Sequence, residues 1–257
     1  EMVGALRALG ADYVFDVTFS ADLTIMEEGS ELLSRILKGT GPLPQFTSCC
    51  PAWVKYMENF HPDKTKYLSS AKSPIGMQGA VIKTYFAHKK HIDPEKIISV
   101  AVTPCTAKKA EIQHEDVKPY VDTVITFEEL QALFDSKHIE ITELGDTAFD
   151  GASYFGRVFA RSGGLIEAVE QGLKEHGFDD FELKGLACDG IDACRVALLK
   201  KKKGVLDANF IEGMACTGGC INGAGCLTHG GESSRADIDK YGRKAGERTI
   251  TDAVTEL

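Results

Sequence analysis

The chain has 257 residues, 43% of them hydrophobic, so it can bury a sizeable core as one large domain or two lobes. Acidic residues number 38 and basic residues 29, which gives a net charge of −9 and argues against nucleic acid as a partner. No apolar run reaches the length of about eighteen residues that a membrane span needs. The eight cysteines do not form the dense framework of a small secreted domain, which favours metal-bound thiolates in the cytoplasm.

The first half of the chain alternates predicted helices with short apolar segments. Residues 2–9 have an amphipathic helical pattern and no initiator Met or signal peptide before them, so we expect the sequence to be part of a longer protein. Residues 13–15 are predicted to form a short buried strand. The second half of residues 16–37 is a clear amphipathic helix, and further helices are expected after Pro51 and over residues 75–90.

One face of the helix within residues 16–37 carries charge. Glu28, Glu31 and Arg35 fall at positions i, i+3 and i+7, so they share one side of the helix. The simplest interpretation is a solvated face with a Glu31–Arg35 ion pair. If the face is buried, the stacked carboxylates would instead form a path that passes protons inward.

The second half repeats a strand-then-helix pattern. Residues 97–102 form a continuous apolar run typical of a buried parallel strand. The remaining predicted elements are strands at 121–125 and 183–187, helices at 127–134 and 191–202, an irregular acidic loop at 140–155, and a charged terminal helix at 235–256. The pattern predicts an α/β fold with mostly parallel sheet flanked by helices.

Four cysteines lie in three loops that contain Gly or Pro, and each loop follows a hydrophobic element: Cys50, Cys105, Cys216 and Cys220. Thiolates are soft ligands for zinc, copper(I) and iron–sulfur clusters. Four of them fit a [4Fe-4S] cluster or a zinc ion equally by number. Structural zinc sites more often use two tight Cys-x2-Cys hairpins, which are absent here, so the spacing favours iron–sulfur.

Cys49 precedes Cys50 directly, and neighbouring side chains diverge, so we expect the two thiols to have different roles. Pro51 would begin a helix whose positive N-terminus lies near both thiols and lowers their pKa. Lys108 follows Cys105 by three residues and would bring a cation to the same edge of the sheet, unless it is an ordinary surface lysine. Cys188 and Cys194 match no standard site and are interpreted as buried small residues.

Three segments closely resemble, in order and spacing, the signature loops of the iron-only (di-iron, [FeFe]) hydrogenases: Thr47-Ser-Cys-Cys-Pro-Ala-Trp53, Pro104-Cys-Thr-Ala-Lys-Lys-Ala-Glu111 and Glu212-Gly-Met-Ala-Cys-Thr-Gly-Gly-Cys-Ile-Asn-Gly223. The resemblance covers nearly the whole chain. It implies that residues 1–257 are the catalytic domain without its usual N-terminal part, and that residues 235–257 form a C-terminal helical segment. It further implies two lobes with the metal centre buried between them.

The centre implied by this resemblance is the H-cluster, a [4Fe-4S] cluster joined through a cysteine sulfur to a di-iron unit. The di-iron unit would carry carbon monoxide, cyanide and a bridging azadithiolate. The implied reaction is the reversible formation of dihydrogen from two protons and two electrons. Cys50, Cys105 and Cys216 would ligate the [4Fe-4S] cluster, while Cys220 would ligate it and bridge to the di-iron unit.

The resemblance also assigns roles around the di-iron unit. Cys49 would exchange protons with the amine of the dithiolate, at the inner end of a path that continues outward through Glu28, Ser69, Glu31 and Arg35. Lys108 would donate a hydrogen bond to a cyanide. The rest of the implied cofactor pocket consists of Thr103, Pro104, Gly163, Gly164 and Met214. The pair Gly163 and Gly164 also opens a predicted helix, whose free N–H groups offer an anion site.

The chain departs from the family pattern at several points. Thr103 stands where the family usually has Met, and Cys226 adds a thiol just beyond the last motif, where a packed small side chain is the simplest interpretation. No ferredoxin-like cysteine clusters are present, so electrons would come from a partner such as ferredoxin or from a further subunit or domain. Maturation proteins would have to build the di-iron unit.

Three other functions remain open on the sequence alone. One is a non-catalytic relative, similar to the hydrogenase-like proteins of cytosolic iron–sulfur assembly, although the intact first motif with Cys49 argues against it. Another is a hydrogen-sensing member of the same family, which the unusual Thr103 leaves open. The third is a structural protein stabilised by zinc.

Overall fold

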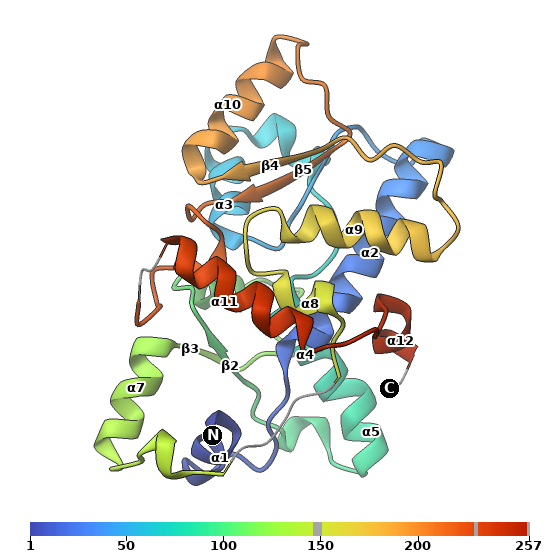
Figure 1. Cartoon of the computed structure of the whole chain (residues 1–257). Helices are drawn as coiled ribbons and strands as arrows, with labels where there is room; N and C mark the ends of the chain where they lie inside the picture. The colour runs from blue at the N-terminus through green and yellow to red at the C-terminus, as the bar shows by residue number, and fades with distance from the viewer. Residues whose placement is uncertain (146–150, 229–230, 256–257) are drawn as a thin grey trace.

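Two small parallel sheets lie in opposite halves of the molecule, as Figure 1 shows for this computed structural model. The structure describes residues 1–145, 151–228 and 231–255. One sheet has the order β1-β5-β4 and the other pairs β2 with β3. The strand bounds are β1 (Gln45–Phe46), β2 (Val100–Thr103), β3 (Thr123–Thr126), β4 (Gly185–Asp189) and β5 (Phe210–Met214). All pairings are parallel, which confirms the predicted α/β class with helices flanking parallel sheets.

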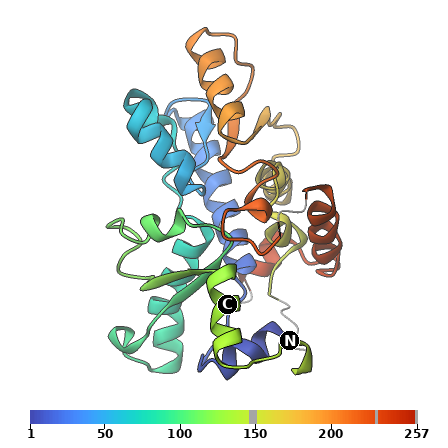
Figure 2. The ribbon, with the colours of Figure 1, turned by 90° about the vertical axis from the view of Figure 1, so that its left-hand side faces the viewer.

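Helix α2 (Val17–Lys38) runs between the two sheets and packs against α4, α8, α9 and α12 (Figures 1 and 2). Asp16 begins it by accepting a hydrogen bond from the Thr18 N–H at 2.9 Å, and Gly39 ends it in the left-handed conformation. The other helices are α1 (Met2–Ala8), α3 (Pro51–Phe60), α4 (Pro74–Val81), α5 (Ala87–Lys90), α6 (Lys108–Glu111), α7 (Phe127–Ser136), α8 (Tyr154–Val158), α9 (Gly164–Glu175), α10 (Ile191–Lys202), α11 (Gly231–Arg243) and α12 (Ile250–Thr255). A π-helix over Ile82–Phe86 joins α4 to α5.

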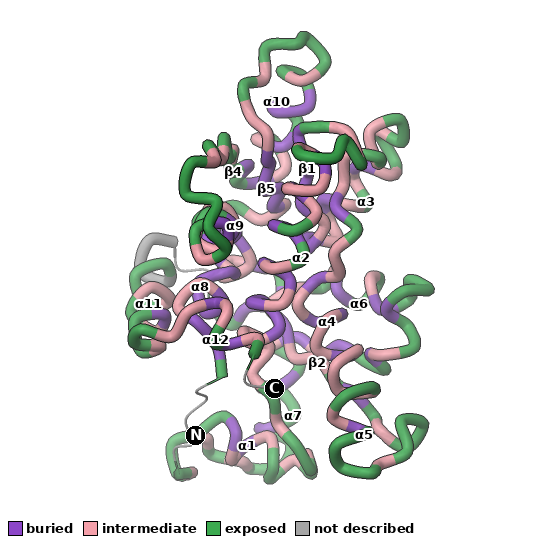
Figure 3. The backbone as a smooth tube through the Cα atoms, turned by 90° about the vertical axis from the view of Figure 1, so that its right-hand side faces the viewer, coloured by how far each residue is buried: buried purple, intermediate pink, exposed green. Residues whose placement is uncertain are grey.

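Buried residues follow α2 and the strands β1 and β5, whereas β4 and the ends of α10, α5 and α1 are mostly exposed (Figure 3). One core cluster packs α2 against α9 and α12 through residues such as Leu32, Leu165 and Ile250. A second packs α3 and α10 onto the larger sheet around Trp53 and Ile211. The two clusters hold the loops that follow β1 and β5 from opposite sides.

The predicted strand at residues 13–15 is wrong. No strand pairs with this segment among the described residues, and Tyr13 is 50% exposed. Tyr13 and Phe15 instead contact the ring of Phe86 edge-on, with centroids 4.8 and 4.9 Å apart. The apolar character of the segment therefore serves aromatic packing on a helical surface rather than a sheet.

Two other predictions need correction. The run at 97–102 becomes a strand only from Val100, and Ile98, which precedes the strand, is 79% exposed. The terminal helix expected at 235–256 is divided into α11 and α12, with Gly246 in a left-handed conformation between them. Part of the acidic loop, residues 146–150, lies outside the described residues. No helix in the described part of the chain combines the length and hydropathy needed to cross a membrane.

Candidate metal centre

The structure brings the four candidate ligands to one site between the two sheets. Cys50 follows β1 and is the N-cap of α3, Cys105 follows β2, and both Cys216 and Cys220 follow β5. All four are free thiols. Burial and the neighbouring thiols of Cys50, Cys105 and Cys216 together raise the pKa of Cys220 to about 12, although Lys108 lowers it. Their mutual influence means that the three loops deliver their thiols within electrostatic range of one another.

The described side chains do not form a ready site for a single metal ion. Within the described ranges, no three His, Cys, Asp or Glu side chains lie close enough together to hold a single metal ion. A structural zinc ion needs all four sulfur atoms about 2.3 Å from one centre. A [4Fe-4S] cluster takes four Cys thiolates, which is the number and type of the candidate ligands here.

Glycines let the loop that carries Cys216 and Cys220 lie directly on neighbouring backbone. Gly219 has φ of 93°, and a Cβ there would meet the Ala160 oxygen at 2.6 Å. A Cβ on Gly223 would lie 2.2 Å from the Pro104 oxygen, and the Gly225 N–H donates to that same oxygen at 2.9 Å. The glycines of the third motif therefore seat the Cys220 loop against the Cys105 loop.

Thr103 lies next to the Cys105 loop and is buried. Its hydroxyl donates to the Cys105 carbonyl at 3.1 Å and accepts from the Cys105 N–H at 3.3 Å. The hydroxyl thus closes the turn that presents the Cys105 thiol, and this use of Thr103 differs from direct packing on a cofactor.

Lys108 is buried rather than on the surface. Its ammonium group donates to the Cys49 carbonyl at 2.9 Å and forms an ion pair with Glu111 at 2.7 Å. Although burial opposes it, the Glu111 carboxylate raises the pKa of Lys108, so the charge is retained inside the protein. A buried cation with a donor proton to spare fits an anionic ligand at this site.

Cys49 is 7% exposed and lies between Lys108 and the charged face of α2. Burial raises the pKa of its thiol well above the usual range, and the Glu28 carboxyl raises it further. The expected lowering by the N-terminus of α3 is wrong, because loss of solvation outweighs the helix dipole at a fully buried position. Cys49 is therefore a neutral thiol that carries a proton.

The glycine pair at the start of α9 has two different surroundings. Gly163 is the N-cap with φ of 82°, and a Cβ on it would meet nothing within 4 Å. A Cβ on Gly164 would lie 2.3 Å from the Val158 oxygen, so this glycine is packed against α8. Of the two glycines, only Gly163 has open space in the direction of a Cβ atom. Met214, at the end of β5, is 2% exposed.

The anion site expected at the N-terminus of α9 is filled by the chain itself. Glu212 on β5 is fully buried and accepts hydrogen bonds from the Gly163 N–H at 2.8 Å and the Ile166 N–H at 3.0 Å. Burial raises its pKa to about 7 against the lowering effect of these bonds. Glu212 therefore ties the start of α9 to the strand that leads into the Cys216 loop, and no external anion is needed there.

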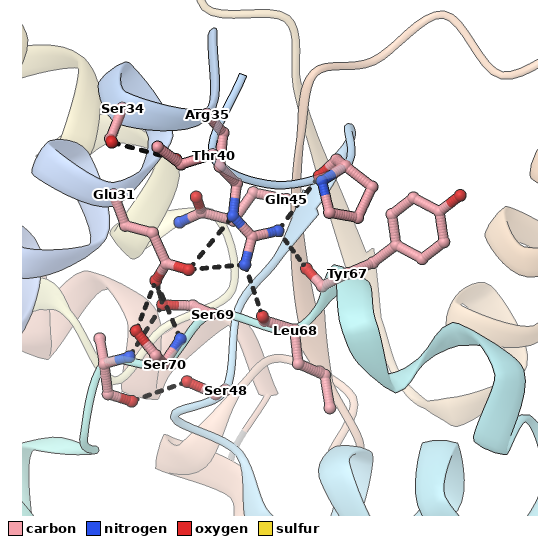
Figure 4. Close-up of polar contacts among 12 residues, drawn as sticks. Glu31, Ser34, Arg35, Thr40, Gln45, Ser48, Tyr67, Leu68, Ser69 and Ser70 are labelled. Carbon is pink, nitrogen blue, oxygen red and sulfur yellow. Dashed lines mark hydrogen bonds and ion pairs between the residues drawn. The ribbon is translucent and has the colours of Figure 1, made fainter. Parts of the chain in front are cut away.

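The charged face of α2 is buried at its inner end, so the solvated-face interpretation fails. Glu28 is fully buried, Ser69 is 7% exposed, and the Glu31 side chain is 20% exposed. The Ser69 hydroxyl donates to Glu31 Oε2 at 2.6 Å, and Arg35 holds Glu31 Oε1 at 2.6 Å (Figure 4). The predicted Glu31–Arg35 ion pair is thus present and Ser69 bonds Glu31, whereas Arg35 is as buried as Ser69, at 7% exposed.

The two carboxyls of this face differ in pKa. Burial raises the pKa of Glu28 to about 7, although the hydrogen bond that Gln45 donates to Oε2 at 2.8 Å lowers it. Burial has the same tendency at Glu31, but Ser69 and Arg35 outweigh it and lower the pKa of that carboxyl. Glu31 is held as an anion, whereas Glu28 can gain or lose a proton near neutral pH.

Arg35 does more than pair with Glu31. Its guanidinium also donates to the backbone oxygens of Pro42, Tyr67 and Leu68 at 3.1, 3.0 and 2.7 Å. These bonds fasten the end of α2 to two loops, as Figure 4 shows. On the other side, the exposed Ser70 donates to Glu31 Oε2 from its N–H at 2.9 Å.

Sequence reasoning missed four residues that shape the site: Gln45, Ser70, Glu111 and Glu212. Two of them had a signal in the sequence. Gln45 and Glu212 are polar residues within short apolar segments that became β1 and β5, and a buried polar group must find a partner. Their partners lie 17 and 49 residues away, so the sequence could not name them.

The remaining cysteines pack as small side chains, as predicted. Cys188 is 2% exposed and Cys194 fully buried, and the Cys194 thiol lies 3.8 Å from the Cys188 oxygen. Cys226 is 6% exposed and its thiol donates to the Ile221 oxygen at 3.4 Å.

Cysteine thiols in loops after parallel strands, together with a buried lysine and buried carboxyls, are typical of an iron–sulfur protein. The profile of the family described as iron only hydrogenase large subunit, C-terminal domain, matches residues 1–224. The chain belongs to this family.

Similar proteins agree with this assignment. The chain is 37% identical to Iron hydrogenase 1 of Clostridium pasteurianum over 86% of its length and 44% of that protein. It is 31% identical to the nuclear prelamin A recognition factor of Homo sapiens over 88% of the chain and 58% of that protein. A variant of the [FeFe]-hydrogenase HydA1 from Chlamydomonas reinhardtii superposes with a TM-score of 0.81 at 28% identity, covering 100% of this chain and 82% of that one. The chain spans about half the length of the curated relatives it matches.

Proposed function

We propose that this chain carries an H-cluster and catalyses the reversible reduction of protons to dihydrogen. One observation carries the proposal most directly: a thiol that is no cluster ligand, Cys49, lies beside the buried Glu28 at the inner end of a ladder of proton carriers. A protein that only stores an iron–sulfur cluster has no use for a buried titratable path that ends at a spare thiol.

The residues present fit the implied group. Cys50, Cys105, Cys216 and Cys220 would hold the [4Fe-4S] cluster, and Cys220 would also bridge to the di-iron unit. Bound there, the H-cluster would supply the electrons and the iron atoms at which protons and dihydrogen interconvert.

Other residues would shape the pocket of the di-iron unit. Lys108 offers a buried ammonium group to its cyanide, and Gly163 leaves open space beside it. Met214 and the Thr103–Pro104 segment would exclude water, because both are packed at the ends of strands.

Proton movement follows from the order of the side chains. Glu31 lies at the partly exposed end and would receive protons from solvent through Ser70. Ser69 would relay them, since its hydroxyl already donates to Glu31. Glu28, with a pKa of about 7, can hold and release a proton at neutral pH, and Cys49 Sγ would be the last protein atom to carry it.

Electrons would have to enter from outside this chain. The family is described as a large subunit, which supports a further subunit or an electron carrier such as ferredoxin as the partner. We expect dedicated maturation proteins to supply the di-iron unit, and the many free thiols favour the cytoplasm as the compartment.

The decisive experiment is an infrared spectrum of the chain, first given its [4Fe-4S] cluster and then loaded anaerobically with a synthetic di-iron complex. Metal-bound carbon monoxide and cyanide absorb where protein does not. We expect bands there that shift under dihydrogen, together with hydrogen evolution from a chemical reductant. Bands without measurable turnover would favour a hydrogen sensor.

A non-catalytic role is the second candidate, because the chain is also 31% identical to the nuclear prelamin A recognition factor. This role predicts a normal [4Fe-4S] signal in electron paramagnetic resonance beside a silent infrared region after loading. That result would remove the catalytic proposal.

A further inference from the structure

Gln45 is a fully buried amide that lies outside the predicted proton path. It lies on β1, four residues before Cys49. Its Nε2 atom donates to Glu28 Oε2 at 2.8 Å and to the Glu28 backbone oxygen at 3.0 Å. The Gln45 side chain therefore forms hydrogen bonds to both the carboxylate and the backbone of Glu28.

The Gln45 amide does not fix the protonation state of Glu28. A guanidinium beside a carboxylate forces it to stay ionised, as Arg35 does at Glu31 one helical turn away. A neutral amide donor favours the ionised form only moderately and cannot itself change charge. Glu28 thus receives enough stabilisation to ionise near neutral pH and not enough to become permanently charged.

The side-chain oxygens without a hydrogen bond indicate which atom of Glu28 takes up the proton. Glu28 Oε1 and Gln45 Oε1 are both buried, and neither has a hydrogen-bond partner among the described residues. With Oε2 occupied by the amide, Oε1 is the atom left to take up and release a proton. Because the same amide is anchored on the Glu28 backbone oxygen, its bond to Oε2 limits rotation of the Glu28 side chain.

We propose that Gln45 is a positioning residue that orients the Glu28 carboxyl and sets the pH at which Glu28 exchanges protons. Its importance for turnover rests on the proposed function, whereas its effect on Glu28 does not. The contact is a property of the protein alone and is testable without the di-iron unit.

The other groups that face Glu28 are few. Glu31 lies on the same helix and disfavours a second negative charge, Ser69 comes from the segment before α4, and Ser48 and Cys49 follow β1. Arg35 has its charge engaged by Glu31. Gln45 is the first of the groups that favour the ionised form of Glu28, so its removal should have the largest effect.

The test replaces Gln45 by a residue of similar length without a donor, Gln45→Met. The full chain carrying only its iron–sulfur cluster is titrated by infrared spectroscopy, and the Glu28 carboxyl band is identified as the band lost in Glu28→Gln. We expect the pH of half-ionisation to rise by about one pH unit, because a hydrogen bond to a charged group is lost. In the fully loaded enzyme the pH–rate profile should shift in the same direction.

A matched control is Gln78→Met. Gln78 on α4 accepts a hydrogen bond from Ser20 at 2.7 Å and does not bond Glu28. This variant should leave the Glu28 titration and the pH–rate profile unchanged. Because a general loss of packing would affect both variants, a shift confined to Gln45→Met separates positioning from a merely structural role.

A second measurement needs no variant at position 45. The side-chain amide nitrogen of Gln45 should change its NMR shift as Glu28 ionises, and Glu28→Gln should abolish this change. An amide signal that ignores the pH, or an unchanged Glu28 midpoint in folded Gln45→Met, overturns the proposal. Absence of hydrogen turnover in the loaded wild type would instead refute the proposed function and leave the titration result standing.

Discussion

A buried ion pair with Glu111 stabilises the positive charge of Lys108, which lies beside Cys49. Lys108 and Glu111 are both about nine-tenths buried and lie 2.7 Å apart, so each is the main compensation for the charge of the other. Burying one ion without its partner costs several kcal/mol, far more than losing an exposed pair. The charge on Lys108, and with it any bond to an anionic ligand, therefore depends on a residue that the ligand would not touch.

We predict that Glu111→Gln lowers the free energy of unfolding by about 3 kcal/mol and weakens retention of the di-iron unit. Urea unfolding and the intensity of the cyanide infrared bands measure the two effects. The control is Glu170→Gln, which removes an exposed ion pair with Lys174 and should cost less than about 1 kcal/mol. Equal losses in the two variants would contradict the role of Glu111.

Cys49 gives the second prediction at the scale of a residue. Cys49→Ala should keep the [4Fe-4S] signal, because Cys49 is no ligand, and should reduce hydrogen turnover at least about a hundredfold, as expected when a proton carrier is lost. Turnover is measured with a chemical reductant after loading. Cys188→Ala, at a buried cysteine outside the path, is the control and should retain turnover. Near-normal turnover in Cys49→Ala would remove this thiol from the mechanism.

What the sequence could predict depends on how far apart the contacting residues are. Cys49, Cys50 and their motif are local, so their chemistry was visible in a few letters. Gln45 and Glu212 act on partners far along the chain, and nothing near either residue indicates which partner it has. Their polarity within apolar segments signalled a function without naming it.

At the scale of an element, the start of α9 combines a strained turn with open space. Gly163 has φ of 82°, and its missing Cβ would point into a volume with no protein atom within 4 Å. The glycine is therefore required by its backbone conformation and, if a cofactor lies there, also by its lack of a side chain. The two requirements are separable, because strain alone lowers stability while obstruction lowers cofactor binding.

We predict that Gly163→Ala costs about 1–2 kcal/mol of stability and in addition abolishes loading of the di-iron unit. Gly204→Ala is the matched control, since Gly204 has φ of 70°, an equally open Cβ direction and an exposed position after α10. Both variants should lose similar stability in thermal unfolding. Normal loading of Gly163→Ala would show that no cofactor occupies this space.

The elements themselves were predicted more reliably than their surroundings. The helix predicted at 191–202 has the bounds of α10, whereas α2 already begins at Val17 and only the second half of residues 16–37 was predicted as helix. The segment at 13–15 failed because three apolar residues do not distinguish a strand from an aromatic contact. Ile98 precedes the strand and is exposed, which no local pattern reports.

At the scale of the whole molecule, ligands from both sheets meet where α2 joins the two halves. Cys105 comes from the smaller sheet, whereas Cys50, Cys216 and Cys220 come from the larger one. A bound cluster would therefore link the halves, and its binding free energy would add to the stability of the fold. The metal-free chain lacks this contribution, so its free energy of unfolding depends more strongly on its buried charged groups.

Three buried carboxyls make the stability of the chain depend on pH. Burial raises the pKa of Asp22, Glu28 and Glu212 to about 7, so in the folded protein each keeps its proton above the pH at which it loses it in the unfolded chain. Between their ordinary values near 4 and pH 7 the folded state thus binds more protons than the unfolded state. The free energy of unfolding must therefore fall as the pH rises through this window.

We predict that urea unfolding of the metal-free chain shows higher stability at pH 5.5 than at pH 8, by about 2 kcal/mol for each fully effective group. Below about pH 4 the trend should reverse, because carboxyls with lowered pKa such as Glu31 and Asp122 then lose their ion pairs. Asp22→Asn should flatten the slope between pH 5.5 and 8, since an amide has no proton to lose.

The control for this prediction is Asp192→Asn, at a carboxylate whose side chain is 89% exposed, which should leave the slope unchanged. A stability that rises from pH 5.5 to 8 would mean that the buried carboxyls are ionised and fully compensated in the folded state. In that case Glu28 would be a fixed anion, unable to release protons at neutral pH. The pH dependence of folding therefore tests the proton path without any metal, because the same burial that costs stability gives Glu28 its ability to exchange protons.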